Sequence, residues 1–178
     1  MIELIKGQLQ ETQGASQLST VSIRNAEERD FLDIMRVAAN CAPIPVERDS
    51  IYHCFTKYFA NTCFVAERYG VVVGFVLGWI SQVDDAAAYV HNVCVTPDMR
   101  KKKIAADLYD RFIEAVKARG CEKVLLIINP KNRISLCFHQ ALGFQICEEG
   151  EGIDIDGVRA VKNYNGPDKH MVVMYKTI

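Results

Sequence analysis

Residues 93–106, with the sequence VCVTPDMRKKKIAA, decide the fold of this chain. An apolar run over 89–95 ends at Thr96-Pro97, and a cationic segment then opens into a helical pattern, which predicts a strand, a turn and a helix. The first N–H groups of a helix lack partners within the helix and carry partial positive charge, so they suit an anion such as phosphate. The cations at 100–103 add to this anion site, and a solvated lysine-rich helix start is the alternative.

The predicted helix extends from near Arg100 to a glycine at 120 that can form its C-cap. Upstream, strands at 63–67 and 71–80 are joined by Arg68-Tyr69-Gly70 in the pattern of a hairpin, and a third strand covers 86–95. Downstream, a strand at 122–128 is apolar throughout, which predicts burial on both faces. The inward stripe of the helix consists of Ile104, Ala105, Leu108, Phe112, Ala115 and Val116.

The flanking segments complete one α/β (α+β) domain at 21–178, preceded by a polar arm at 1–20. We expect a mixed, mostly antiparallel central sheet with helices on both faces. The further elements predicted are a strand at 21–24, helices at 26–40 and about 47–59, a helix at 132–142, a strand to about 148, a loop or weak hairpin at 149–169, and a last strand at 171–175. The second helix is predicted to turn Ile51, Cys54, Phe55 and Tyr58 inward.

Composition limits the function classes. The chain has 178 residues, of which 49% are hydrophobic, so one domain with a substantial core is expected. A net charge of −1 gives no basic balance of the kind found in proteins that bind nucleic acid or anionic membranes, so the local basic cluster suits a small polyanion. The longest apolar stretch, 71–80, is too short to span a bilayer, and the amino end lacks the apolar core of a signal peptide.

Seven cysteines are scattered along the chain, and no two are spaced C-x-x-C. A structural zinc site or a disulfide framework needs closer pairing. We therefore expect reduced thiols that pack as small hydrophobic groups in a cytoplasmic protein, with no metal ligands.

The turn and helix start resemble the pattern Arg/Gln-x-x-Gly-x-Gly/Ala of the GNAT superfamily of acyl-CoA-dependent N-acetyltransferases. That pattern aligns on RKKKIA at 100–105, and VTPDMR at 95–100 is similar to the V-x-P-x-x-R that precedes it in the family. Lys103 replaces the middle glycine. Its side chain would crowd a pyrophosphate unless it turns outward, where it could pair with a ribose phosphate instead.

A second block, NRISLCFHQALGF at 132–144, resembles the family's N-x-x-[AS]-x-x-x-[YH]-x-x-x-G-F. Helical spacing puts Asn132, Ser135 and His139 on one face, which makes a plausible wall for a cofactor, with a solvent face as the alternative. The opposite face, with Ile134, Phe138, Ala141 and Leu142, is expected to face the core.

The resemblance implies acetyl-CoA or coenzyme A as co-substrate. It implies that the backbone of Val93, Cys94 and Val95 pairs with the pantetheine arm, and that the amide groups of Ile104, Ala105 and Ala106 hold the pyrophosphate. The complete set of expected cofactor-binding residues is Val93, Cys94, Val95, Arg100, Lys101, Lys102, Lys103, Ile104, Ala105, Ala106, Asn132 and Ser135.

Two histidines are the catalytic candidates. By resemblance, His139 takes the place of a tyrosine that protonates the departing thiolate. Because an unperturbed histidine titrates at about 6.5 and a tyrosine at about 10, this role needs low pH or a raised pKa. His91, on the strand before the turn, is the candidate base and is expected on the side of Tyr89, Val93 and Val95 by alternation. Glu47 is a weaker candidate base.

The sequence thus predicts a cytoplasmic N-acetyltransferase that moves an acetyl group directly to a primary amine of a small molecule, amino acid or peptide. The alternative is an acyl-CoA-binding sensor or partner subunit with little catalysis. A covalent acyl-cysteine route through Cys94 or Cys137 lacks a neighbouring base in the sequence, and core packing of these thiols is favoured. Nucleic acid and membrane partners are not expected, and exposed strand edges leave a homodimer open.

Overall fold

The computed structural model describes residues 21–41 and 51–178. A seven-stranded sheet has the order β1-β2-β3-β4-β5-β9-β6, and all of its neighbouring strands are antiparallel except β4 and β5. This agrees with the predicted mixed, mostly antiparallel sheet. Its strands are β1 (Ser22–Asn25), β2 (Phe64–Arg68), β3 (Val71–Ile80), β4 (Ala87–Val95), β5 (Lys123–Ile128), β6 (Gln145–Ile146) and β9 (Val172–Thr177).

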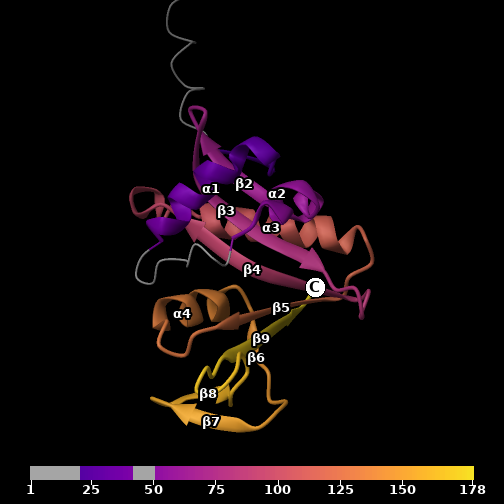
Figure 1. Cartoon of the computed structure of the whole chain (residues 1–178), viewed down its shortest axis with the longest axis vertical. Coiled ribbons are helices and arrows are strands. Elements are labelled where there is room, and N and C mark those ends of the chain that lie inside the picture. The colour runs from indigo at the N-terminus through magenta and orange to yellow at the C-terminus, as the bar shows by residue number, and fades with distance from the viewer. Residues whose placement is uncertain (1–20, 42–50) are drawn as a thin grey trace, which may run out of the picture.

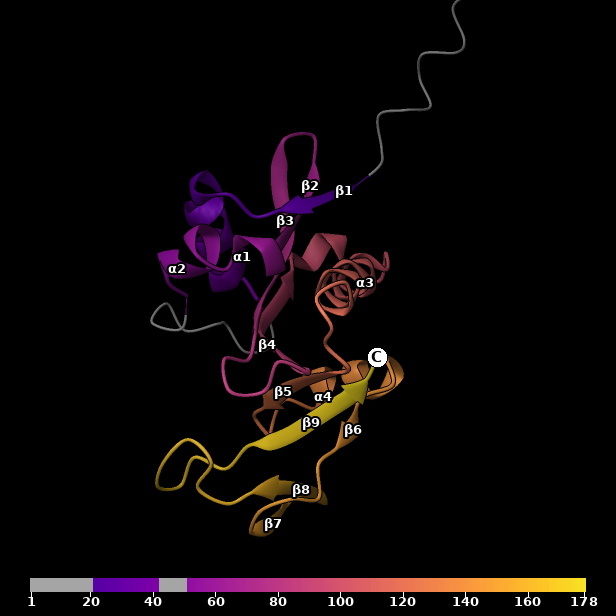
Figure 2. The same ribbon diagram turned by 90° about the vertical axis from the view of Figure 1, so that its right-hand side faces the viewer.

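Helices cover both faces of the sheet, as predicted (Figures 1 and 2). One core packs α1 and α2 against β2 and β3, and a second core holds α3 and α4 on the opposite face. The helices are α1 (Phe31–Ala39), α2 (His53–Lys57), α3 (Ile104–Lys117) and α4 (Arg133–Ala141), with 3-10 turns at Glu28–Asp30, Ala60–Thr62 and Pro97–Met99.

Strands β4 and β5 diverge, and this divergence makes room for a site (Figure 1). Their parallel pairing covers Ala87, Ala88 and Tyr89 of β4 and ends there. Among the residues that the structure describes, the rest of β4 has no strand on that edge, because β3 pairs with its other edge. The open edge of β4 therefore faces the space between the two halves of the sheet.

A β-bulge interrupts β4 at His91. Leu77 of β3 pairs with Asn92, and the next residue, Gly78, pairs with Val90, so His91 is an extra residue on β4. A bulge shifts the alternation of side chains between the two faces of a sheet.

The bulge overturns part of the expectation for His91. The His91 ring stacks on the Phe55 ring with a centroid distance of 5.1 Å, and its centroid lies 5.5 Å from that of Trp79. Both contacts are on the face of the sheet covered by α2. Val93 and Val95 instead pack in the core on the α3 face. His91 thus shares a side with Tyr89, as expected, but not with Val93 and Val95.

Other expectations differ in detail. Helix α3 begins at Ile104 because the preceding residues form a loop in which Lys101 and Lys103 have positive φ angles of 61° and 63°. Tyr58, expected inward, is 76% exposed. In β5 the burial alternates, so the strand is fully buried on one face only. The arm at 1–20 and the predicted start of the second helix at about 47 lie outside the described residues.

The segment 149–169 contains the hairpin that the sequence left open as one of two alternatives. Strands β7 (Gly152–Ile155) and β8 (Val158–Val161) pair with each other as a separate two-stranded sheet. Arg159 of β8 ties this hairpin to the segment before β7, because its guanidinium donates to the carbonyl oxygens of Cys147, Glu148 and Gly150.

Candidate active site

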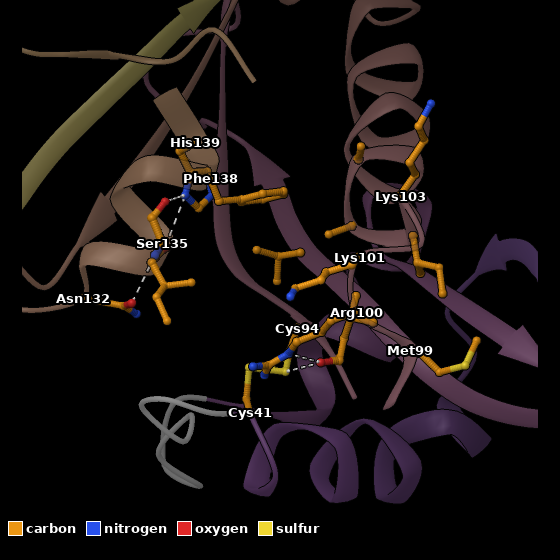
Figure 3. Close-up of a pocket in the computed structure, with 16 residues that line it drawn as sticks. Cys41, Cys94, Met99, Arg100, Lys101, Lys103, Asn132, Ser135, Phe138 and His139 are labelled. Atoms are coloured by element: carbon orange, nitrogen blue, oxygen red, sulfur yellow. Dashed lines mark hydrogen bonds between the residues drawn. A yellow bond between two sulfur atoms is a disulfide. The ribbon is translucent and has the colours of Figure 1, made fainter. Parts of the chain in front are cut away.

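A cavity of about 650 Å³ opens between β4, the start of α3 and α4. In Figure 3, Asn132, Ser135 and His139 lie on one side of it, and Arg100 and Lys101 lie across from them. The structure brings every predicted cofactor-binding residue except Lys102 to this cavity. Its lining consists of Cys41, Val93, Cys94, Val95, Met99, Arg100, Lys101, Lys103, Ile104, Ala105, Ala106, Asn132, Ile134, Ser135, Phe138 and His139.

The start of α3 presents backbone donors to the cavity. The hydrogen bonds of the helix begin with the N–H of Asp107 and the carbonyl of Lys103, so the N–H groups of Ile104, Ala105 and Ala106 precede them. Lys103 caps the helix with a φ of 63°, a left-handed conformation that glycine adopts without steric cost. This explains physically why the family pattern has glycine there. The Lys103 side chain is exposed and runs along α3 in Figure 3.

The four cations at 100–103 have different orientations. Arg100 donates from Nε to the carbonyl oxygen of Val95 at 3.1 Å, which ties the loop to β4. Lys101 reaches across the cavity toward α4 (Figure 3). Lys102 turns back, and its Nζ donates to the carbonyl oxygen of Asp98 at 3.1 Å, which explains its absence from the cavity lining.

The open edge of β4 contributes backbone groups. Thr96 donates its N–H to the carbonyl of Val73 on β3. Because successive residues of an antiparallel strand point their backbone groups to opposite edges, those of Val93 and Val95 point away from β3. The bond from Arg100 to the Val95 carbonyl agrees with that direction.

Helix α4 turns its polar face inward. Asn132 is the N-cap, and its Oδ1 accepts from the N–H of Ser135 at 3.1 Å. His139 is only 4% exposed, whereas Ile134 is 64% exposed. The expected core-facing set is therefore wrong for Ile134 and for Ala141, which is also exposed, while Phe138 and Leu142 are partly buried against the core. Leu136 is the fully buried apolar residue of this helix.

Both ring nitrogens of His139 have partners. Nδ1 lies 2.7 Å from the backbone oxygen of Ser135, and Nε2 lies 2.7 Å from the hydroxyl of Tyr109. Burial lowers the pKa of His139 to about 4, although the bond to Ser135 opposes this shift. His139 therefore lacks the raised pKa that a role as an acid at neutral pH requires.

Tyr109 is a residue that the sequence analysis missed. It is 1% exposed, and Leu108 and Phe112 of the predicted inward stripe of α3 are buried with it. Its spacing from Phe112 and Val116 could have placed it on that stripe. Nothing in the sequence pointed to His139 as its partner, because the two residues are 30 positions apart.

A smaller cavity of about 150 Å³ lies beside the first, and His91, Asn92 and Tyr109 are among its lining residues. The two cavities meet at the residues that line both of them. These are Cys41, Val93, Asn132, Ser135 and His139. His91 and His139 thus border the same small cavity. Glu47, the weaker candidate base, lies outside the described residues.

A disulfide joins Cys41 to Cys94 in the wall of the larger cavity. The expectation of reduced thiols throughout the chain is wrong for this pair. The two cysteines are 53 residues apart in sequence, and their Cα atoms lie 5.9 Å apart. The fold brings them together because α1 ends above β4, a contact that spacing along the chain does not reveal.

Comparison with known proteins agrees with this architecture. The model of the acetyltransferase (GNAT) family matches residues 23–144, which is more than half of the chain. The chain therefore belongs to this family and is an N-acetyltransferase. The family match does not favour the alternative of a non-catalytic sensor.

Two relatives illustrate the match in sequence. An L-2,4-diaminobutyric acid acetyltransferase of Nocardia farcinica is 25% identical over 130 residues, which cover 73% of this chain and 67% of that protein. An uncharacterized N-acetyltransferase of Methanocaldococcus jannaschii is 36% identical over 93 residues, but these cover only 50% of this chain and 41% of that protein.

Solved structures share the fold at low identity. Ard1 from Thermoplasma volcanium has a TM-score of 0.71 at 18% identity, and the match covers 89% of this chain and 97% of Ard1. A diaminobutyrate acetyltransferase of Paenibacillus lautus, in complex with L-2,4-diaminobutyric acid and coenzyme A, has a TM-score of 0.67 at 20% identity, with coverage of 89% and 96%. Within 21–41 and 51–178, no helix is long and apolar enough to cross a membrane.

Proposed function

We propose that this N-acetyltransferase binds acetyl-CoA in the larger cavity and transfers the acetyl group directly to a primary amine that enters the smaller cavity. The observation that carries the proposal is the meeting of the two cavities at Cys41, Val93, Asn132, Ser135 and His139. The larger cavity offers hydrogen-bond donors for an anion, and the smaller cavity adjoins it and has polar residues in its lining.

The residues of the larger cavity fit the anionic end of acetyl-CoA. The N–H groups of Ile104, Ala105 and Ala106 would hold the pyrophosphate, because they precede the hydrogen bonds of α3 and carry the positive end of its dipole. Lys101 and Lys103 would add charge beside them. This is the same donor set that favours phosphate at many helix starts.

The rest of the donor would lie along β4. Backbone groups of Val93 and Val95 on the open edge would pair with the pantetheine arm, with Cys94 between them on the strand. Asn132 and Ser135 would form the opposite wall. When bound, acetyl-CoA supplies a thioester whose carbonyl carbon is open to attack by a neutral amine.

The two histidines remain the proposed active-site residues, but only His91 is assigned a proton-transfer step. His91, which lines the smaller cavity, would take the proton of the incoming ammonium, directly or through water. His139 would lie beside the sulfur at the junction of the cavities. With its pKa lowered to about 4, it would be there as a neutral ring.

Relatives suggest two classes of acceptor. Several are named for acetylation of L-2,4-diaminobutyric acid, and one is an L-amino acid N-acyltransferase of Escherichia coli. A structural neighbour is the ribosomal-protein-S18-alanine N-acetyltransferase of Escherichia coli. We propose amines of amino acids as the first class to test and amino-terminal amines of peptides as the second.

A thiol-release assay tests this proposal. Purified protein is given acetyl-CoA with L-2,4-diaminobutyrate, with a panel of other amino acids, and with peptides that have a free amino terminus. We expect release of coenzyme A that depends on the amine and falls at least tenfold in His91→Ala, as loss of a positioned base predicts. No amine-dependent release from any of these acceptors would contradict the proposal.

A further inference from the structure

Tyr109 and His139 form a buried hydrogen-bonded pair between α3 and α4. The hydroxyl of Tyr109 lies 2.7 Å from Nε2 of His139, and the side chains are 1% and 4% exposed. Both border the smaller cavity, and His139 borders the larger cavity as well. The pair therefore lies where donor and acceptor would meet.

The partners of the ring fix the positions of its protons. The backbone oxygen of Ser135, 2.7 Å from Nδ1, can only accept a hydrogen bond, so Nδ1 carries a proton. In a neutral imidazole the other nitrogen is then an acceptor. The Tyr109 hydroxyl must donate to Nε2, and no other arrangement satisfies both bonds in an uncharged ring.

The surroundings oppose any charge on either group. Burial raises the pKa of Tyr109 and lowers that of His139 to about 4. The rings of Phe138 and Phe144 lie nearly perpendicular to the His139 ring, with centroid distances of 5.1 Å and 5.6 Å. Tyr109 from α3 and the Ser135 hydroxyl from α4 contact the ring. The other polar or charged side chains that line the two cavities with it are His91, Asn92, Arg100, Lys101, Lys103, Asn129 and Asn132.

We propose that Tyr109 is a positioning residue of the acetyl-transfer site, whose hydroxyl holds the His139 ring in the uncharged form that carries its proton on Nδ1. The proposal rests on the proposed function, because it assigns the junction of the two cavities to the thioester. It assigns no contact with substrate to Tyr109 itself, which acts through His139.

Acetyl transfer requires one proton for the departing sulfur. As the amine nitrogen bonds to the acetyl carbon, the bond from carbon to sulfur breaks, and the sulfur keeps the electron pair and takes one proton. Neither ring nitrogen of His139 offers that proton, since Nδ1–H is bonded to Ser135 and Nε2 already accepts from Tyr109. The nitrogen loses two protons in the reaction: His91 takes the first from the ammonium, and the second, given up as the amide forms, passes to the sulfur directly or through water at the junction.

Nitrogen-15 NMR of the imidazole tests the first half of the proposal without requiring any activity. The signals are assigned by their loss in His139→Gln. In the wild-type protein we expect a protonated Nδ1 and an unprotonated, hydrogen-bonded Nε2 from pH 5.5 to 8. In Tyr109→Phe the neutral form loses a donor, so the pKa of His139 should rise by about 1, which a titration extended down to about pH 4 measures. A wild-type ring protonated on Nε2, or one that titrates near 6.5, would overturn the proposal.

Kinetics tests the second half. Tyr109→Phe keeps the packing of the ring, and we expect kcat to fall about tenfold while the KM for acetyl-CoA changes less than twofold, because only a group at the junction is displaced. As the pH falls, the kcat of the variant should also begin to decline at a pH about one unit higher than the kcat of the wild type does. Tyr175→Phe, which removes an exposed hydroxyl bonded to Gln145, is the matched control and should retain wild-type kinetics.

The outcomes separate this proposal from the proposed function. A folded Tyr109→Phe protein with wild-type kcat across pH 5.5 to 8 would overturn the positioning role of Tyr109. The proposed acetyl transfer would stand in that case. Absence of coenzyme A binding in the wild type would instead overturn the proposed function. If Tyr109→Phe does not fold, the NMR of the wild-type ring still decides the state of His139.

Discussion

At the scale of single residues, the sequence predicted which side chains of α4 lie together but not that one of them would be buried. Helical spacing put Asn132, Ser135 and His139 on one face, and the structure has them together at both cavities. A polar stripe is usually turned to solvent. Here it is turned inward, because Tyr109 satisfies the buried ring of His139 from another helix. Such a partner is set by tertiary packing and leaves no local pattern.

The buried neutral state of His139 predicts an acid-sensitive contribution to stability. Its pKa is about 4 in the folded protein, against about 6.5 for an unperturbed histidine. Because the unfolded chain takes up the proton first as pH falls, the contribution is complete above about 6.5 and is lost between about 6.5 and 4. The loss amounts to roughly 3 kcal/mol by linkage.

Urea unfolding at pH values from 7.5 to 4 measures this contribution. We expect the free energy of unfolding to fall over that window in the wild type and to fall less in His139→Gln, which cannot take up the proton. Parallel pH dependence in the two proteins would show that His139 is not held neutral by the fold.

At the scale of elements, the disulfide between Cys41 and Cys94 ties the end of α1 to β4 beside the larger cavity. Sequence spacing gave no sign of it, since the two cysteines belong to elements that meet only in the folded sheet. The same holds for the bulge at His91, which depends on the register of β3 against β4. Periodicity predicts a strand and its average faces, but an extra residue in one strand becomes visible only in the pairing.

Removal of this disulfide by mutation should destabilise the fold. A link across 53 residues restricts the unfolded chain, and we expect Cys41→Ser to lower the free energy of unfolding by about 2–4 kcal/mol. Thermal unfolding of the oxidised protein measures the effect, and Cys137→Ser, at an exposed free cysteine, is the control. Equal melting temperatures for Cys41→Ser and the wild type would show that the link contributes nothing to stability.

At the scale of the whole molecule, most of the architecture followed from local patterns. Alternating and apolar runs predicted the strands, the turn at Tyr69 and Gly70 predicted the hairpin of β2 and β3, and the helices fell where apolar residues recur. The divergence of β4 and β5 did not follow, because it depends on a parallel pairing between segments separated by α3. The site lies at that divergence, so its residues were predictable and the cavity that joins them was not.

The central claim is that the start of α3 and the open edge of β4 bind the acetyl donor. Calorimetric titration of coenzyme A into the wild type and into Lys101→Ala tests it most directly. We predict one site per chain, and an affinity about fivefold weaker in Lys101→Ala, as the loss of one exposed charge contact of about 1 kcal/mol requires. No detectable binding to the wild type, or equal affinity in Lys101→Ala and the wild type, would contradict this account.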